Sequence, residues 1–385
     1  MFYLLTFMQQ NISKVVLYIN FNHTAKQTLF MENKYQIYND NLVLYNDMLK
    51  DIEEAKKCIF LETFRFGTGS IGEKFRIALI EKARQGVKVK VLIDGWGSNS
   101  DTSFYEPMTQ YGVDLRVYRK IKLARAFFKK NHCRNHRKIL IIDNKITYIG
   151  SSNLTAYSIS WRELNLRIDN SELTKLFRYS FNESFRTYNK YTLSKKSYKR
   201  NQYYDSWVLV QDVPNPYHQA IKRYYQMMID RATEEVIIES PYFLPGHRLR
   251  RKLCEAVARG VKVTIIIPFH SDVRLVDIVS RKYLGELYEG GVQIRFYLLG
   301  NLHSKGFMVD NKTFSISSSN FDYRSFRYQY ELALIGEEPS VVEQLKEHFE
   351  ASIKYTKEFE YENWKNRSGI EKFFEWLLVP FRYLM

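Results

Sequence analysis

The sequence predicts an α/β protein made of two tandem domains, related by a pseudo-two-fold axis, with mixed, largely parallel sheets and helices on both sheet faces. Three observations lead to this prediction. Short apolar runs typical of strands alternate with segments of helical periodicity. The same order of elements occurs in both halves of the chain, and one polar motif occurs once in each half. A repeat of domain size indicates a tandem duplication rather than a solenoid.

The pattern of the first half begins near Lys34. Met48, Ile52 and Ala55 recur at helical spacing, and Gly86 is a plausible C-cap of a later helix. Segment 87–94 alternates apolar with polar residues and then becomes fully apolar, as an inner strand does. We expect helices at 44–57, 72–85 and 105–111, and strands at 58–62, 87–94 and 113–118.

The second half repeats this order. We expect helices at 217–232, 248–259 and 281–288, and strands at 235–239, 261–268 and 292–298. The segments Ala83–Val89 and Ala258–Val263 share the pattern of Ala-Arg, a Gly, and then Val-Lys-Val. These segments occupy corresponding positions, which supports a duplicated unit.

Composition and charge shifts suggest where the domains end. The chain has 385 residues and 45% hydrophobic content, enough for two domains with cores of their own. We expect an N-terminal arm at 1–34, a first domain at 35–190, a second at 207–350 and a C-terminal amphipathic tail at 351–385. Residues 191–206 are expected to be a solvated basic linker. For the tail we favour docking onto the body over membrane contact.

The net charge of +16 and the pI near 9.4 indicate an anionic partner, which nucleic acid and acidic lipid both satisfy. Three scattered cysteines predict a reducing compartment without a disulfide framework. The apolar character of residues 1–20 is interrupted by Gln9, Gln10, Asn11 and Lys14. We therefore expect neither a membrane span nor a secretory signal, and any membrane contact should be peripheral.

The polar motif comprises His136, Lys138 and Asp143, followed by Ser151 and Asn153. Its second copy has the same spacing: His303, Lys305, Asp310, Ser318 and Asn320. Residues 139–142 read as a buried strand, Asp143-Asn144 as a turn and 146–149 as the returning strand. On a strand, residues two apart lie on one face, so each His and its Lys should point the same way.

Two such units placed face to face bring together two imidazoles, two ammonium groups, two hydroxyls and two amides. We predict that Lys138, Lys305 and the side chains of Ser151, Asn153, Ser318 and Asn320 bind a phosphate diester. One neutral His can attack phosphorus while the other, protonated, donates to the leaving oxygen. The lysines neutralise charge, so we expect no metal and no cofactor.

Further residues support this site. Asp143 and Asp310 belong to the catalytic motif, but their strand parity differs, so we expect them in turns or supporting positions. Glu163 and Glu331 follow the two motifs in strand-like runs and are candidates to orient the histidines, with Glu163 assigned to His136. His132 lies nearby, but the region has too few nitrogen or sulfur ligands for a zinc site.

The approach to His136 has no counterpart before His303. From Arg119 to Lys138 there are nine Lys or Arg and no acidic residue, interleaved with apolar side chains. We predict a membrane-docking loop, since basic residues near anionic lipid contribute about 1 kcal/mol each. Its docking residues are Lys122, Arg125, Phe127, Phe128, Lys129 and Lys130. A solvated basic loop or a nucleic-acid patch is the alternative.

The chain resembles the phospholipase D superfamily, whose double signature is His-x-Lys-x4-Asp followed by Gly-Ser-x-Asn. It is most similar to the bacterial cardiolipin synthases of that superfamily, from about residue 35 to 380. Two departures are Ser317, which replaces the Gly of the second signature, and the lack of paired N-terminal membrane helices. The segments that carry the resemblance are 134–138, 161–163, 241–245, 259–261, 302–305 and 320–326.

The resemblance implies a phosphatidyltransferase that joins two phosphatidylglycerols and releases glycerol through a phosphohistidine. It places the nucleophile on His136, the acid on His303, and phosphate binding on Lys138, Lys305, Asn153 and Asn320. The expected partner is anionic phospholipid, namely phosphatidylglycerol. The expected location is the cytoplasmic face of the bacterial cytoplasmic membrane. No protein partner is required, because one chain carries both half-sites.

Two alternatives stay open. A phospholipase D-type phosphodiesterase would use the same groups to hydrolyse lipid, or to cut nucleic acid as a metal-independent nuclease. A degenerate lipid-binding scaffold would be non-enzymatic, but both motifs retain His and Lys. The amphipathic stretch 121–128 and the apolar C-terminus favour lipid over nucleic acid.

Overall fold

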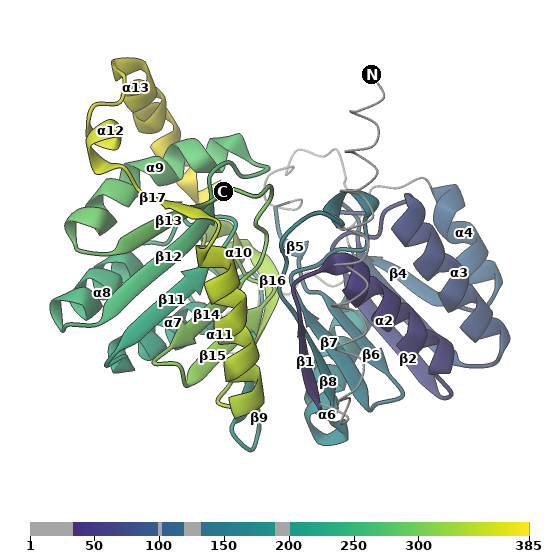
Figure 1. Cartoon of the computed structure of the whole chain (residues 1–385). Coiled ribbons are helices and arrows are strands. Elements are labelled where there is room, and N and C mark those ends of the chain that lie inside the picture. The colour runs from purple at the N-terminus through teal and green to yellow at the C-terminus, as the bar shows by residue number, and fades with distance from the viewer. Residues whose placement is uncertain (1–33, 99–101, 119–131, 189–200, 385) are drawn as a thin grey trace, which may run out of the picture. The chain divides into compact units, whose positions relative to one another are not determined.

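Two mixed β-sheets, one from each half of the chain, form the frame of the protein (Figure 1). This computed structural model describes residues 34–98, 102–118, 132–188 and 201–384. The predicted arm up to residue 33, the docking residues from Lys122 to Lys130 and most of the predicted linker lie outside the described residues. From Tyr35 onward, the described residues form one unit.

The first sheet has seven strands in the order β1-β8-β7-β6-β2-β3-β4. Its strands are β1 (Tyr35–Tyr38), β2 (Cys58–Thr63), β3 (Lys88–Asp94), β4 (Asp114–Tyr118), β6 (Ile139–Ile142), β7 (Ile146–Gly150) and β8 (Asn165–Asp169).

The second sheet follows the order β17-β13-β12-β11-β14-β15-β16-β10-β9, and the short strand β5 also pairs with β16. Its strands are β5 (Arg134–Asn135), β9 (Gln202–Tyr204), β10 (Trp207–Asp212), β11 (Glu235–Glu239), β12 (Lys262–Pro268), β13 (Gln293–Tyr297), β14 (Gly306–Val309), β15 (Thr313–Ser317), β16 (Gln329–Gly336) and β17 (Thr356–Glu358). β9 lies in the range predicted as linker, where it forms a hairpin with β10.

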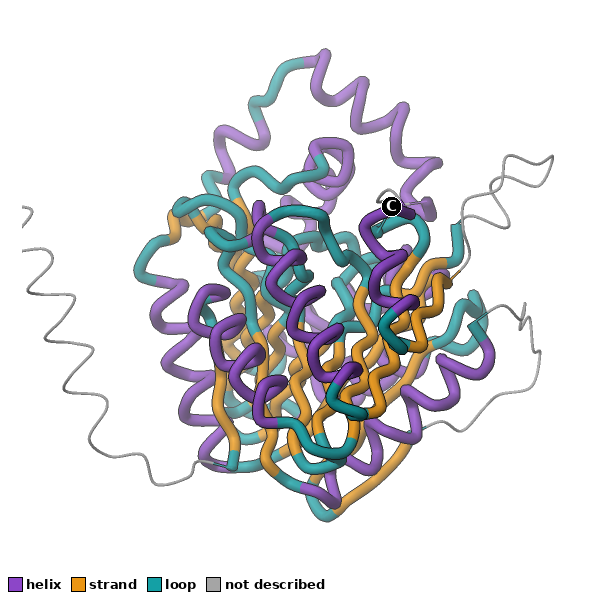
Figure 2. Tube along the Cα trace, turned by 90° about the vertical axis from the view of Figure 1, so that its right-hand side faces the viewer, coloured by secondary structure: helices purple, strands orange, loops and turns teal. Residues whose placement is uncertain are grey.

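Helices flank the strands, which run together through the middle of the unit in Figure 2. In the first half they are α2 (Asn41–Glu54), α3 (Ser70–Arg84), α4 (Thr102–Gln110), η1 (Ala156–Ser158) and α6 (Ser171–Thr187). In the second half they are α7 (Ala220–Arg231), α8 (His247–Ala258), α9 (Arg274–Glu289), α10 (Tyr323–Tyr328), α11 (Pro339–Ile353), α12 (Tyr361–Lys365), α13 (Gly369–Leu378) and η2 (Val379–Leu384). No helix among the described residues is long and apolar enough to cross a membrane.

The α/β class with two duplicated halves is confirmed, but the expectation of largely parallel strands is wrong. Among the described strands, only β2-β3-β4, β11-β12-β13 and the β5–β16 pair are parallel, and the remaining neighbours are antiparallel. The cause of the error is that both kinds of strand are covered on both faces here. Residues Ile139–Ile142 of β6, for example, are all buried although both neighbours of β6 are antiparallel. A continuous apolar run therefore does not reveal strand direction.

Alternate residues of one strand enter different cores. In β2, Ile59 and Leu61 pack with α2 and α3, whereas Cys58 and Phe60 face a central core. In β11, Val236 and Ile238 face the outer core of the second half, and Ile237 faces the same central core. This central core contains apolar residues of both halves, including those of α6 and α11. The two halves therefore share a core rather than each having only its own.

Candidate active site

The two motif-bearing segments each cross to the other half of the molecule. β5, just before His136, pairs with the start of β16, and the His136 amide donates to the carbonyl of Tyr330 at 3.0 Å. Correspondingly, the His303 amide donates to the carbonyl of Arg162 at 2.8 Å. Residues 136–138 and 303–305 lie outside the regular strands and precede β6 and β14, so the prediction that they lie within those strands is wrong. Their backbone is bonded across the pseudo-symmetric interface instead.

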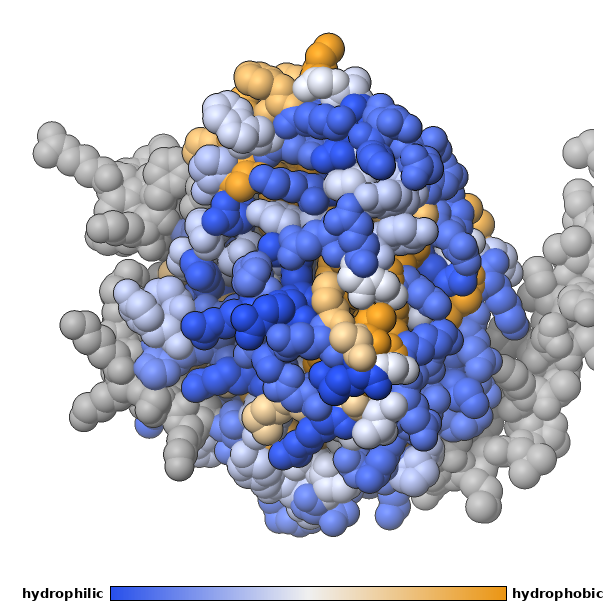
Figure 3. Space-filling view, turned by 90° about the vertical axis from the view of Figure 1, so that its left-hand side faces the viewer, coloured by the Kyte–Doolittle hydropathy of each residue, from blue (hydrophilic) through white to orange (hydrophobic). Residues whose placement is uncertain are grey.

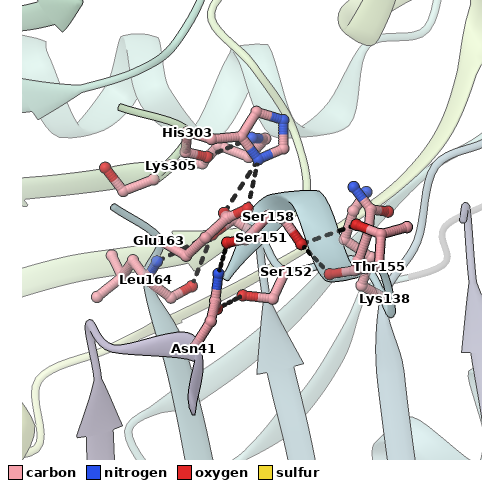
Figure 4. Close-up of polar contacts among 12 residues, drawn as sticks. Asn41, Lys138, Ser151, Ser152, Thr155, Ser158, Glu163, Leu164, His303 and Lys305 are labelled. Atoms are coloured by element: carbon pink, nitrogen blue, oxygen red, sulfur yellow. Dashed lines mark hydrogen bonds and ion pairs between the residues drawn. The ribbon is translucent and has the colours of Figure 1, made fainter. Parts of the chain in front are cut away.

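Each histidine is held by the glutamate of the opposite half. His136 Nδ1 lies 3.0 Å from Glu331 Oε1. His303 Nδ1 lies 2.8 Å and 3.0 Å from the two Glu163 oxygens. Dashed lines mark these contacts in Figure 4. The choice of both glutamates as partners of the histidines agrees with the structure, but the assignment of Glu163 to His136 is wrong, because the pairs are crossed. The backbone bonds explain the crossing, since each Glu comes directly after the residue that accepts a bond from the opposite histidine.

Both lysines lie beside their own histidine. Lys138 Nζ donates to the carbonyl of His136 at 2.7 Å, and Lys305 Nζ donates to the carbonyl of His303 at 2.6 Å. The four side chains are buried, with 2–7% of their surface exposed. An ammonium has three donors, so each lysine keeps further donors for a substrate oxygen.

Charged groups of each motif shift the pKa values of groups in the other motif. Burial, followed by Lys138, Lys305 and His303, lowers the pKa of His136 well below its ordinary value. Burial lowers the pKa of Lys138 to about 7 and that of Lys305 to about 8. Since charges of one motif affect groups of the other, the structure brings the two motifs together, as predicted from the repeat.

The two halves of the site are not equivalent. For His303, burial lowers the pKa, but the charge of Glu163 offsets part of that shift. For Glu331, burial raises the pKa to about 8, and Ser318 Oγ donates to its second oxygen at 2.5 Å. His136 thus has the stronger tendency to stay neutral, and His303 the stronger tendency to hold a second proton.

Ser151 and Ser318 face the strand that carries the glutamates. Ser151 Oγ donates to the carbonyl of Leu164 at 3.1 Å and accepts from its amide at 2.9 Å. Ser318 Oγ accepts from the amide of Leu332 at 3.0 Å. These hydroxyls are occupied by the residues directly after Glu163 and Glu331. These bonds suit a role in positioning the glutamates, and the contact of Ser151 and Ser318 with phosphate stays a prediction.

Asn153 and Asn320 are buried in the site, each 4% exposed. Asn153 Oδ1 accepts from the backbone N–H of Arg65 at 3.3 Å. The side-chain NH₂ group of Asn153 therefore points away from Arg65 N. The backbone N–H of Asn320 donates to Ser325 Oγ at 3.3 Å. Both side chains stay candidates for binding a phosphate oxygen.

Ser317, which departs from the superfamily signature, is explained by its neighbour across the sheet. In the first copy Gly150 pairs with Asn165, and a Cβ at Gly150 would lie 2.4 Å from Asn165 Oδ1. In the second copy Ser317 pairs with the smaller Ala333. The smaller partner, Ala333, leaves more room for a side chain at position 317 than Asn165 leaves at position 150.

Asp143 and Asp310 lie outside the site. They follow β6 and β14 at the ends away from the histidines, with φ values of 51° and 53°. Asp143 accepts backbone N–H bonds from Lys56, Lys57 and Cys58 at 2.6–2.9 Å. Asp310 accepts the equivalent bonds from residues 233–235. Although partial burial opposes it, these donors hold the pKa of both carboxyls below the ordinary range. The catalytic grouping of these residues is wrong, and the turn interpretation from strand parity agrees with the structure.

Sequence reasoning missed a set of buried carboxylates beneath the site. Glu62 accepts from Asn135, the residue before His136, at 2.6 Å. At the equivalent position of the second half, Glu239 accepts from Ser304 and lies 2.8 Å from His348 Nε2. Aligning the two copies would have found this pair, because each Glu lies at or next to the C-terminal end of a buried strand.

Asp94 is a further buried anchor. It accepts from Asn135 N at 2.9 Å, and its Oδ1 lies 3.3 Å from Arg134 Nη1 in a fully buried ion pair. These bonds fix β5 and so the position of His136. No counterpart was visible in the sequence, since β12 ends in Pro268 at the corresponding place.

Comparison with known proteins decides the family. The family model described as "Cardiolipin synthase, PLD-like domain" matches residues 48–185 and 225–353, which is more than half of the chain. The chain belongs to this phospholipase D-like cardiolipin synthase family. It is accordingly an enzyme of the phosphatidyltransferase type.

Curated relatives agree with that family, and a solved structure shares the fold. A cardiolipin synthase of Clostridium perfringens is 27% identical over 93% of this chain and 78% of its own length. That of Oceanobacillus iheyensis is 30% identical over 83% and 69%. A phosphatidylserine synthase of Haemophilus influenzae has a similar fold, with a TM-score of 0.73 and 13% identity over 92% of this chain and 96% of that one.

Proposed function

We propose that this family member is a cardiolipin synthase that transfers a phosphatidyl group from one phosphatidylglycerol to another and releases glycerol. The observation that carries the proposal is the crossed pair of His–Glu contacts, which unites two His-x-Lys motifs in one buried site. Two imidazoles with oriented Nδ1 atoms, flanked by two ammonium groups, suit a phosphodiester that must be attacked and protonated.

The asymmetry of the site supports His136 as the nucleophile. A nucleophilic imidazole must be neutral, and the low pKa of His136 favours that form. Glu331, when ionised, accepts the Nδ1 proton, so that Nε2 carries the free lone pair. His303, beside both oxygens of Glu163, is the group better suited to deliver a proton.

The reaction then proceeds in two balanced steps. His136 Nε2 attacks phosphorus, the bond from phosphorus to the glycerol oxygen breaks, and His303 Nε2 gives its proton to that oxygen. In the second step a hydroxyl of another phosphatidylglycerol loses its proton to His303 and attacks phosphorus. The phosphorus–nitrogen bond breaks, which releases cardiolipin and regenerates both histidines. Lys138 and Lys305 neutralise the non-bridging oxygens throughout.

We further propose peripheral attachment to the cytoplasmic face of the bacterial cytoplasmic membrane. α13 contacts α9 and is held to the preceding loop by the Arg367–Glu375 ion pair at 2.7 Å. Apolar side chains on its other side stay exposed, and an apolar patch is visible at the top of Figure 3. An exposed apolar helix face of this kind suits shallow insertion among lipids. The exposed residues of α13 are Ile370, Phe373, Phe374, Trp376 and Leu377, and Phe381 of η2 is exposed as well.

The basic-aromatic loop before His136 remains part of this proposal on sequence grounds. Replacing both Phe127 and Phe128 by Asp should weaken binding to phosphatidylglycerol vesicles and slow lipid turnover, because the loop would lose its inserting side chains. Turnover of a detergent-dispersed short-chain substrate should be unchanged and serves as the control. Unchanged vesicle binding would contradict a docking role for this loop.

The central experiment incubates the purified protein with phosphatidylglycerol vesicles in EDTA and follows the products by mass spectrometry. We expect cardiolipin and glycerol in equal amounts, and no product from His136→Asn. Phosphatidic acid in place of cardiolipin would indicate a hydrolase. A parallel reaction with plasmid DNA tests the nuclease alternative, and loss of turnover in EDTA would refute the metal-free mechanism.

A further inference from the structure

A cavity of about 400 Å³ lies in the second half, between α7, α8, α10 and η2, and it is lined by cations. None of its lining residues belongs to either His-x-Lys motif. Its lining includes Lys222, Arg223, Arg248 and Arg327, together with Tyr323 and Tyr383, and it contains no Asp or Glu.

Little of the positive charge of this cavity is compensated within the described part of the chain, where the charge of Arg223 acts on Asp212, a carboxyl whose pKa burial raises to about 7. There, none of the four cations forms an ion pair. Burial and then the charges of Arg327 and Arg248 lower the pKa of Lys222, with no carboxylate acting against them. Arg327 Nε is buried without a hydrogen-bond partner. Cations that lie close together repel one another, and a buried donor without an acceptor is unfavourable. Both effects destabilise the folded protein unless an anion binds among the cations.

The start of α8 adds further donors at the same place. Gly246, the N-cap of this helix, lines the cavity and provides no side chain to cap it. A Cβ placed on Gly246 would lie 3.4 Å from Lys222 Nζ, so the amine is next to the helix terminus. Backbone N–H groups and the helix dipole make such a terminus favourable for an anion.

We propose that this cavity binds a phosphate group, either that of an anionic lipid headgroup at the membrane or that of a soluble phosphate ester. Several cations around a helix N-terminus match the charge and the acceptor oxygens of a phosphate. The two tyrosines stack on Arg327, with its Cζ 5.4 Å from the Tyr323 ring and 4.6 Å from the Tyr383 ring. Tyr383 follows α13 along the chain, so the cavity adjoins the segment proposed to meet the membrane. None of the residues that line the cavity has been assigned a role in the transfer chemistry, so its binding can be measured without turnover.

The test compares three forms of the full-length protein with the wild type. Lys222→Gln/Arg327→Gln removes two cations of the cavity. Arg251→Gln/Lys252→Gln removes the same charge from α8 outside the cavity, where both residues form surface ion pairs. Gly246→Asp places a carboxylate in the cavity at a position with ordinary space for a Cβ.

Binding is measured by co-sedimentation with vesicles of phosphatidylcholine, with and without phosphatidylglycerol, and by calorimetric titration with glycerol 3-phosphate. We expect the cavity variant to bind at least about tenfold more weakly than the α8 control, since each basic residue near a lipid phosphate contributes roughly a factor of five. Gly246→Asp should also lose binding while its melting temperature rises, because an N-cap carboxylate satisfies the cations and the helix terminus.

Each outcome decides the proposal. Selective loss of vesicle binding identifies a lipid headgroup, and selective loss of glycerol 3-phosphate binding identifies a soluble ester. Equal binding by the cavity variant, Gly246→Asp and the α8 control would overturn the proposal. These readouts need no turnover, so failure to detect cardiolipin formation would not affect them.

Discussion

Replacing Glu163 by Gln should impair His303 and leave His136 intact. Glu163 holds His303 Nδ1 through two short contacts in a fully buried position. A hydrogen bond to a charged group contributes about 1.5–3 kcal/mol, equivalent to about a 10- to 150-fold change in rate. In a serine protease triad the same carboxylate-to-amide change lowers kcat about 10⁴-fold through the wrong tautomer. We therefore expect a loss of about 10²- to 10⁴-fold in the transfer from phosphatidylglycerol.

The assay must separate attack from protonation. Phosphatidyl-p-nitrophenol has a leaving group that departs without a proton, so formation of the phosphohistidine no longer needs the general acid. The nitrophenol burst of Glu163→Gln should then be close to wild type, whereas Glu331→Gln, which affects His136, should lose the burst.

The reverse pattern would mean that Glu163 orients His136 and would refute the crossed pairing. Equal loss of the burst in both variants would contradict the division of roles between the histidines. Circular dichroism and melting curves of both variants verify that they fold.

The buried charges lead to three further expected outcomes. The pH profile of kcat/KM should be a narrow bell with both limbs near pH 7–8. Activity should rise with pH as Glu331, whose pKa is raised to about 8, ionises. It should fall with pH as Lys138, whose pKa is lowered to about 7, loses its proton. Asp143→Asn should reduce the free energy of unfolding by about 1–2 kcal/mol in urea titrations, with kcat unchanged per folded molecule, because it bonds only backbone donors. Asp94→Ala should cost about 3–5 kcal/mol in the same titration by leaving Arg134 buried without its partner carboxylate.

Each of these three predictions would be contradicted by a specific result. A level kcat/KM between about pH 6 and 9 would contradict the titration of these buried groups. An Asp143→Asn protein of normal stability but low kcat would restore that residue to the catalytic machinery. An Asp94→Ala protein as stable as wild type would show that its contact with Arg134 does not hold β5 in place.

The local pattern of the sequence was sufficient for many of the elements and for the His, Lys and Glu residues of the site. The periodicity of 44–57 predicted α2 to within a few residues, and strand parity separated Asp143 from His136. Both inferences depend on neighbours in the chain, which periodicity describes directly.

The errors concern contacts between distant segments. Glu163 is nearer in sequence to His136 than to His303, but the bond from His303 to the Arg162 carbonyl decides its partner. The direction of β6 is set by its pairing with β2 and β7, while its apolar residues are the same for either direction. Such pairings depend on the tertiary fold and leave no periodic signal.

The crossed His–Glu contacts also suggest how a chain of this kind could arise. If a chain with a single repeat paired as a symmetric dimer, the glutamate of each subunit would support the histidine of the other, because in a two-fold interface every contact occurs twice. Fusing two copies keeps these crossed His–Glu contacts in one polypeptide and removes the requirement that the two half-sites be identical. The copies have since diverged around the same chemistry: Phe64 packs on His136, and Trp161 packs on His303. In a single chain that holds both copies, the two histidines can therefore differ in role, as proposed above, one for attack and one for proton transfer.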